Sequence, residues 1–151
     1  MKTLRLLAVS AAVMAALTGL SATARQAVSN EPIDPSAVQL EQQQQNGIAY
    51  LSGGIGLDET RAIQQAKGYN LHMTFSTGPG NEYVPDIDVT IQNMQGHALL
   101  RLNEVGPIVY ADLSPGKYVI VATRNGQEQR STVELKGGAV RDLNLHWSDA
   151  T

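Results

Sequence analysis

The sequence predicts a mainly β fold, a seven-stranded antiparallel β-sandwich preceded by one short helix. From Leu71 onward, apolar and polar residues alternate in short runs, which is the period of a half-buried strand. Turn residues separate these runs, and the pair Asn125-Gly126 is typical of a two-residue hairpin. The chain has no Cys, so no disulfide can stabilise it and it must rely on a hydrophobic core, which two packed sheets provide.

The seven expected strands are placed by their apolar positions. They are Leu71–Phe75, Ile87–Ile91, Ala98–Leu102, Ile108–Leu113, Lys117–Arg124, Gln129–Leu135 and Leu143–Trp147. Alternation places one set of side chains of each strand in the space between the sheets. The residues expected there include Phe75, Val89, Ile91, Leu113, Tyr118, Ile120 and Leu145.

A helix is expected at residues 58–67, before the first of these strands. Asp58 suits the N-cap position, and Gly68 suits the left-handed conformation that often follows a helix end. Ile63 and its alanine neighbours form a narrow apolar stripe, so the helix should rest on a sheet. The glycine-rich residues 53–56 before it lack the remaining positions of a dinucleotide or phosphate loop, which indicates a turn.

The first residues have the pattern of a secretory signal peptide. Lys2 and Arg5 precede an uncharged run, Leu6–Leu20, and Ala22-Thr23-Ala24 supplies a small-x-small cleavage site. The run is shorter than the ~20 residues of a membrane span. We therefore expect a signal peptide at residues 1–24 and a periplasmic or secreted protein with no membrane span after cleavage. Without Cys it cannot be a lipoprotein, and cleavage lowers the formal charge from −3 to −5 because two positive residues are lost.

Three further segments complete the expected organisation. Residues 25–46 contain few large apolar residues and the run Gln42–Gln45, so they are expected to form a flexible Gln-rich tail. Residues 47–147 form the sandwich domain, which includes the helix and allows a short strand at Ile48–Leu51. Residues 148–151 are a C-terminal tail.

One strand is apolar on both faces. Tyr118–Ala122 contains no polar residue, which is typical of a strand covered on both sides. We expect Ile63 and Ala66 of the helix to cover Val119 and Val121. If that cover is incomplete, Val119 and Val121 form a candidate interaction or self-association surface.

Two segments resemble a known family. Residues 113–118 read Leu-Ser-Pro-Gly-Lys-Tyr before an apolar strand, and residues 88–96 form a strand that runs into an Asn-x-x-Gly turn. This pattern, over about residues 71–145, resembles the carboxypeptidase regulatory-like domain, a transthyretin-like or Ig-like β-sandwich, as it occurs in small exported proteins of Gram-negative bacteria. The resemblance implies a non-catalytic accessory module that binds a protein or another cell-envelope component, with no cofactor and no catalytic residues.

Histidine and aspartate side chains offer the other candidate chemistry in this sequence. Three histidines, His72, His97 and His146, could serve a small transthyretin-like hydrolase, which is the alternative function. They lack local metal-ligand spacing, and the sequence contains no Tyr-Arg-Gly-Ser tetrapeptide of the kind that those hydrolases use. Asp86 and Asp88, with Glu82 nearby, offer oxygen ligands for calcium, although two carboxylates on one strand face are more often simply solvated.

Nucleic acid is not an expected partner. The formal net charge is −3, so the basic excess that marks nucleic-acid binding is absent. The sequence therefore predicts an exported binding or accessory module and leaves its partner open.

Overall fold

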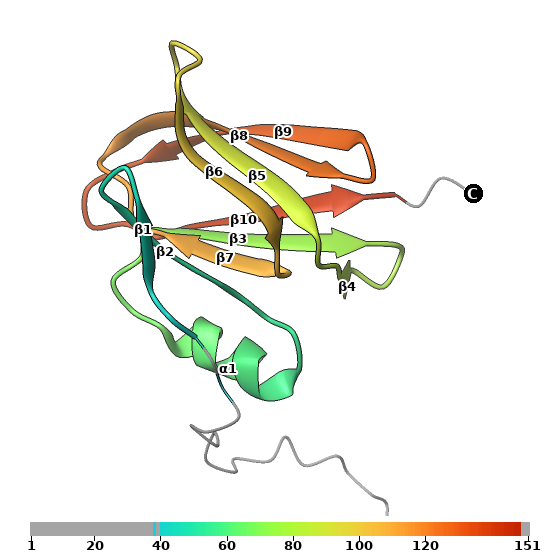
Figure 1. Ribbon diagram of the computed structural model, residues 1–151. Coiled ribbons are helices and arrows are strands. Elements are labelled where there is room, and N and C mark those ends of the chain that lie inside the picture. Colours follow the sequence, from blue (N-terminus) through green and yellow to red (C-terminus); the bar gives the residue numbers. More distant parts are fainter. Residues whose placement is uncertain (1–37, 39, 149–151) are drawn as a thin grey trace, which may run out of the picture. The chain divides into compact units, whose positions relative to one another are not determined.

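Two sheets pack face to face in the computed structural model, which describes residue 38 and residues 40–148 (Figure 1). The first, sheet A, has six strands in the order β1-β2-β7-β3-β10, and β4 pairs with β3. The second, sheet B, has four strands in the order β6-β5-β8-β9. One helix, α1, lies on the side of sheet A that faces away from sheet B. The sandwich character predicted from the sequence is confirmed.

The described residues form ten strands and one helix. They are β1 Gln43–Gln45, β2 Ile48–Gly53, α1 Leu57–Gln65, β3 Leu71–Thr77, β4 Glu82–Tyr83, β5 Ile87–Asn93, β6 Ala98–Val105, β7 Ile108–Ala111, β8 Gly116–Arg124, β9 Gln127–Leu135 and β10 Arg141–Trp147. Each of the seven predicted strands is present. The count of seven is too low, because β1, β2 and β4 are also strands.

Sheet A is mixed, which corrects the expectation of a wholly antiparallel sandwich. β10 runs parallel to β3, with Arg141 opposite Leu71 and Trp147 opposite Thr77. β7 lies on the other side of β3 and is antiparallel to it. Alternation reports which face a residue takes but not the direction of the neighbouring strand, so the pattern could not reveal the parallel pair.

Sheet B consists of antiparallel pairs throughout. β8 and β9 form the predicted hairpin, in which Arg124 pairs with Gln127 around Asn125 and Gly126. Both turn residues have positive φ, 48° and 77°, as a tight hairpin of this kind requires. β5 lies between β6 and β8, and Ile91 faces Ile120 across the central pair.

The main core fills the space between the sheets. All seven residues predicted for it are buried: Phe75, Val89, Ile91, Leu113, Tyr118, Ile120 and Leu145. Trp147 at the end of β10 is also buried, and its ring nitrogen donates a hydrogen bond of 2.9 Å to the Gln127 carbonyl of β9. This bond links the two sheets at the end of the sandwich where β10 finishes.

The helix is shorter than predicted and is capped differently. It begins at Leu57, with Gly56 at the N-cap and no side-chain capping bond, so Asp58 lies in the first turn and is not the cap. The helix ends at Gln65, two residues before the predicted end. The Thr60 hydroxyl donates to the Gly56 carbonyl at 2.7 Å, which secures the first turn from inside the helix.

The helix does not cover Val119 and Val121, which corrects the expectation for that strand. Ile63 is fully buried against Leu51, Tyr69 and the outward-facing residues of β7. Both faces of β7 are therefore buried, the inner one in the sandwich core and the outer one under α1. Because α1 follows β2 after a short loop, and β2 pairs with β7, the helix rests on sheet A.

The Gln-rich segment is partly folded, although residues 25–46 were expected to be a flexible tail. Gln43–Gln45 form β1 and pair with β2 around a turn at Asn46 and Gly47. The Gln45 side chain also reaches β6, where it accepts from the Arg101 N–H at 2.6 Å and donates to the Arg101 carbonyl at 3.0 Å. One amide thus takes the place of a neighbouring strand at the β6 edge.

Several expectations concern residues outside the described part of the chain. The signal peptide, residues 1–24, lies there, together with most of the segment 25–39 and residues 149–151 of the C-terminal tail. Ser148 is described and exposed. The described helix, α1, has nine residues and falls short of the length and hydropathy that a membrane span requires.

Candidate functional site

The outer face of sheet B contains the two valines singled out from the sequence. Val119 pairs with Gln92 on one side and Thr132 on the other, and Val121 pairs with Thr90 and Arg130. Directly paired residues project to the same side of a sheet. The valines therefore lie at the centre of a face whose margins are polar.

These polar neighbours explain why the two valine side chains have limited exposure to solvent. Val121 is 9% exposed and Val119 is half-buried, although α1 lies on the other sheet. Arg130 lies opposite Val121 on β9, and long side chains at such positions shield apolar neighbours with their stems while their polar ends stay in water. Cross-strand packing thus replaces the helix cover that the sequence suggested. The face remains open to a partner.

A depression lies at one end of this face. It has a volume of about 590 Å³, and the residues that line it are Met94, Lys117, Thr132, Glu134, Leu135, Lys136, Ala139, Val140 and Arg141. Thr132 pairs with Val119, and Glu134 pairs with Lys117 on the same face. The depression is therefore continuous with the surface around Val119 and Val121. The sequence did not reveal it, because its residues come from two turns and from strands β8, β9 and β10 without a shared motif.

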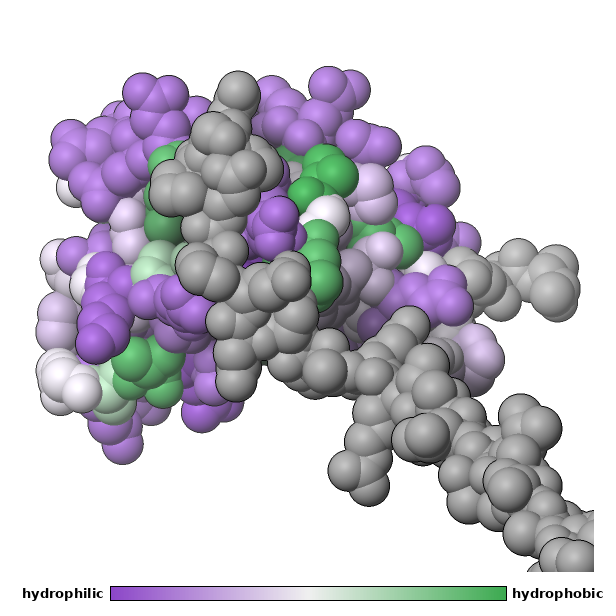
Figure 2. All heavy atoms as spheres, turned by 90° about the horizontal axis from the view of Figure 1, so that it is seen from below, coloured by the Kyte–Doolittle hydropathy of each residue, from purple (hydrophilic) through white to green (hydrophobic). Residues whose placement is uncertain are grey.

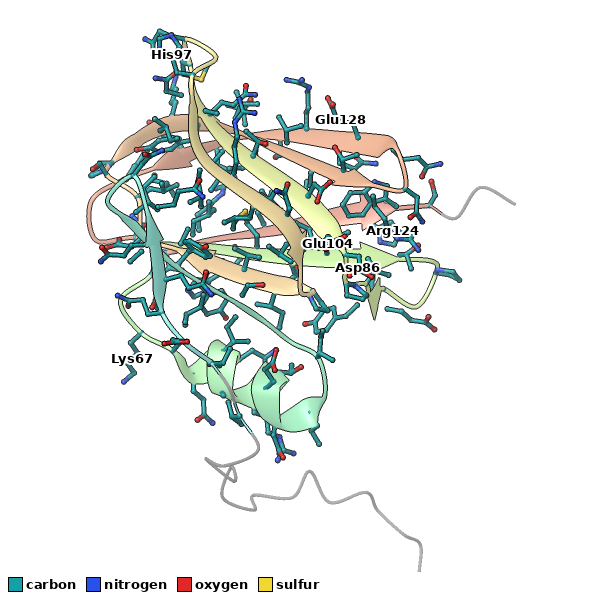
Figure 3. The ribbon with its side chains drawn as sticks, in the orientation of Figure 1. Lys67, Asp86, His97, Glu104, Arg124 and Glu128 are labelled. Atoms are coloured by element: carbon teal, nitrogen blue, oxygen red, sulfur yellow. The ribbon has the colours of Figure 1, made fainter. Side chains whose placement is uncertain are left out.

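The histidines are spread over separate places. His97 lies at the tip of the β5–β6 hairpin (Figure 3), whereas His72 and His146 are on β3 and β10 of sheet A. The His72 ring stacks on Tyr110 with 3.6 Å between centroids, and its Nδ1 lies 3.2 Å from Asp142. The strand register separates His146 from His72 by four residues, or about 13 Å. The three rings do not form one site.

A row of polar pairs joins β3 and β10 on the outer face of sheet A. His72 faces Asp142, Thr74 faces Asn144 and Ser76 faces His146. The Ser76 hydroxyl donates to the Asn144 amide oxygen at 3.0 Å and lies 3.0 Å from His146 Nδ1. Ser76 is 1% exposed and His146 is half-buried, so this serine–histidine pair is a partly buried polar contact.

The two aspartates proposed for calcium have structural surroundings. Asp88 accepts the Glu104 N–H at 3.0 Å, beside a β-bulge in the β5–β6 pair. The Asp86 N–H donates to the Val105 carbonyl at 2.9 Å, and Asp86 has positive φ. Figure 3 shows Asp86 and Glu104 at the end of sheet B opposite His97. Within the described residues, no three His, Cys, Asp or Glu side chains group closely enough to hold a metal ion.

The α1 side of the protein offers a different kind of surface. Ile55 and Leu57 are more than 60% exposed beside the start of the helix. On the visible part of this side, hydrophilic residues separate the hydrophobic ones into small patches (Figure 2). Gly53, before the helix, is closely packed, since a Cβ there would lie 2.7 Å from the Leu40 side chain and a Cβ on Gly106 would lie 2.5 Å from the Gly53 carbonyl oxygen. No feature of a phosphate loop is involved.

Neither a protein-family model nor a curated protein sequence matches this chain. The outer face of sheet B and its depression are accordingly the candidate site on geometry alone.

Proposed function

We propose that this protein is a non-catalytic binding or accessory module of the cell envelope, and that it contacts a partner protein through the outer face of sheet B. One observation carries the proposal. Val119, which is half-buried, and Val121, which is 9% exposed, lie at the centre of a face that none of the described helices or strands covers, since α1 packs on sheet A. An apolar centre within a polar margin is the usual composition of a protein–protein interface.

The resemblance to carboxypeptidase regulatory-like domains supports the same class of function. In the segment that carries the resemblance, the Tyr118 hydroxyl donates to the Ser114 carbonyl at 2.5 Å, and Leu113 and Tyr118 are both buried. This bond closes the Pro-Gly turn in the manner of a tyrosine corner, a feature of Ig-like sandwiches. We therefore propose a transthyretin-like or Ig-like fold and an accessory role for this chain.

Export belongs to the proposal as well. The pattern of Lys2, Arg5 and the run Leu6–Leu20 favours secretion to the periplasm or beyond, with cleavage after Ala24. A cell-envelope component or a second copy of this chain is the partner we expect.

Site-specific photo-crosslinking in intact cells tests the proposal. A photoreactive residue replaces Thr90 or Thr132 on the outer face of sheet B, or, as the control, the exposed Gln64 of α1. We expect the two sheet-B positions to give the same crosslinked product and Gln64 to give none. Equal crosslinking from all three positions, or a product from Gln64 alone, would contradict the proposal.

A small hydrolase is the second candidate, and one observation favours it. The Ser76 hydroxyl lies 3.0 Å from His146 Nδ1, the distance of a nucleophile from its general base. A substrate would have to reach a buried serine whose hydroxyl also binds Asn144. Ester hydrolysis that is lost in both Ser76→Ala and His146→Ala would favour this candidate, and we expect no activity that depends on these residues.

A further inference from the structure

We propose that the depression at the Lys117 end of sheet B binds an acidic residue of a partner protein, within a segment that also carries apolar side chains. This inference rests on the proposed function, because it names the chemistry of the partner at one end of the same face. The depression begins on the outer face of sheet B, at Lys117 and Glu134, and continues around the end of β9 to the loop before β10.

The charge of the depression carries the inference. Lys117, Lys136 and Arg141 contribute three positive charges, and Glu134 contributes one negative charge. All four side chains are exposed. Within the described residues, no ion pair or hydrogen bond engages the side chains of the three cations. The site is therefore locally basic on a chain whose formal net charge is −3, and its positive charges lack an internal partner.

The apolar residues that line the depression indicate that the partner segment carries apolar side chains beside its acidic residue. Met94, in the β5–β6 turn, is 55% exposed, and Val140, in the loop before β10, is 56% exposed. Both side chains line the depression, as does the smaller Ala139. Met adapts its shape to a partner surface, and exposed apolar side chains beside unpaired cations are the complement of an acidic, partly apolar peptide.

A peptide fits this site better than an anionic lipid surface does. Membrane docking needs basic residues spread over a surface that projects toward the bilayer, whereas these cations line a hollow. The chain as a whole is acidic, so an anionic bilayer repels it. The three cations outnumber the one carboxylate of the depression, Glu134, so the site favours a further carboxylate from a partner.

Titration of the purified protein with a defined peptide tests the inference by NMR. The probe is an acetylated, amidated heptapeptide, Ser-Leu-Glu-Leu-Glu-Leu-Ser, and its control carries Gln in place of Glu. We expect amide shifts confined to the depression and its rim, a dissociation constant of about 0.1–1 mM, and at least about tenfold weaker binding of the Gln peptide. Higher salt should weaken binding, because the charges are exposed.

Substitutions test whether Lys117 and Lys136 supply the charges that bind the peptide. The double variant Lys117→Ala/Lys136→Ala should weaken binding by about tenfold or more. Lys67→Ala is the matched control, because Lys67 is an exposed lysine beyond the end of α1 (Figure 3), and it should change the affinity by less than about twofold. Circular dichroism of each variant establishes that it is folded.

Three results would overturn the inference: equal binding of the Gln peptide, no shifts in the depression at millimolar peptide, or binding to phosphatidylglycerol vesicles in place of the peptide. The photo-crosslinks from Thr90 and Thr132 separate this failure from failure of the proposed function. If those crosslinks persist while the peptide does not bind, the binding face stands and the acidic partner is wrong. If the crosslinks are absent, the proposed function itself fails.

Discussion

At the scale of single residues, glutamine side chains form hydrogen bonds that cover the edge of the sandwich. Gln42 accepts a hydrogen bond of 2.6 Å from the Tyr69 hydroxyl, and Gln43 accepts one of 2.8 Å from Tyr50. Gln45 binds both backbone groups of Arg101 on β6. An exposed sheet edge invites pairing with another chain, and an amide that occupies its hydrogen-bonding groups reduces that tendency.

Replacement of Gln45 should therefore cost more than replacement of its neighbour. Gln45→Ala loses two hydrogen bonds to the backbone, and we expect the free energy of unfolding to fall by about 1–3 kcal/mol. Gln44 makes no side-chain hydrogen bond among the described residues, so Gln44→Ala should stay within about 0.5 kcal/mol of the parent. Urea unfolding measures both variants. Equal losses would mean that the amide bonds to β6 do not matter.

Buried tyrosines make the free energy of unfolding depend on pH in the alkaline range. Burial raises the pKa of Tyr118, and burial together with the nearby charge of Asp142 raises the pKa of Tyr110. The folded state thus favours the neutral phenols. Their contribution is fully present below the unfolded value of about 10 and is lost as the pH rises through the raised folded values.

Tyr118→Phe tests this dependence. At neutral pH the variant loses the bond to Ser114 and should be less stable by about 0.5–1.5 kcal/mol. Above about pH 10 the difference from the parent should shrink, because the parent also loses the contribution of this phenol. Urea unfolding at neutral and alkaline pH measures the difference, and a constant value across that range would contradict the assignment.

At the scale of elements, the connection of α1 to β2 explains why the helix packs on sheet A and not on sheet B. Both β7 and the centre of β8 are apolar on their two faces, so both strands had the sequence pattern of doubly covered strands. The helix rests on β7, because β2 precedes it and pairs with β7. A pattern along the chain cannot reveal the order of strands across a sheet, so the expected cover over β8 was wrong.

The contact of α1 with sheet A rests on one large side chain. Ile63 is the buried residue of the helix, and it packs on Leu51, Ile108 and Tyr110. Ile63→Ala should lower the free energy of unfolding by about 2–5 kcal/mol. Gln64→Ala, at an exposed position of the same helix, should change it by less than about 0.5 kcal/mol. Similar values for the two variants would show that the helix adds little to stability.

At the scale of the molecule, the sequence predicted what depends on alternation and turn chemistry. The buried set around Phe75 and Ile120 and the hairpin at Asn125 follow from those rules. The strand formed by Gln43–Gln45 does not follow from those rules, because a polar run without periodicity is typical of a flexible tail. The depression around Lys117 and Arg141 also escaped prediction, since only the folded chain brings those residues together.

Export is a property of the whole chain and has a direct test. Cleavage after Ala24 should leave a mature protein that begins at Arg25 and carries no lipid. Amino-terminal sequencing and intact mass of the periplasmic or extracellular protein determine the first residue. A protein that retains Met1 in those fractions would contradict the expectation.

The central claim is that the outer face of sheet B binds a partner, and Val121→Lys tests it most directly. The experiment measures, in the same variant, the free energy of unfolding and the photo-crosslink formed from Thr132. Gln64→Lys is the control, with the same change of charge on α1. We predict that Val121→Lys unfolds within about 1 kcal/mol of the parent, because the lysine stem can pack where valine did and its amine can reach water, and that its crosslink is lost. A variant that stays folded and retains the crosslink would contradict the account.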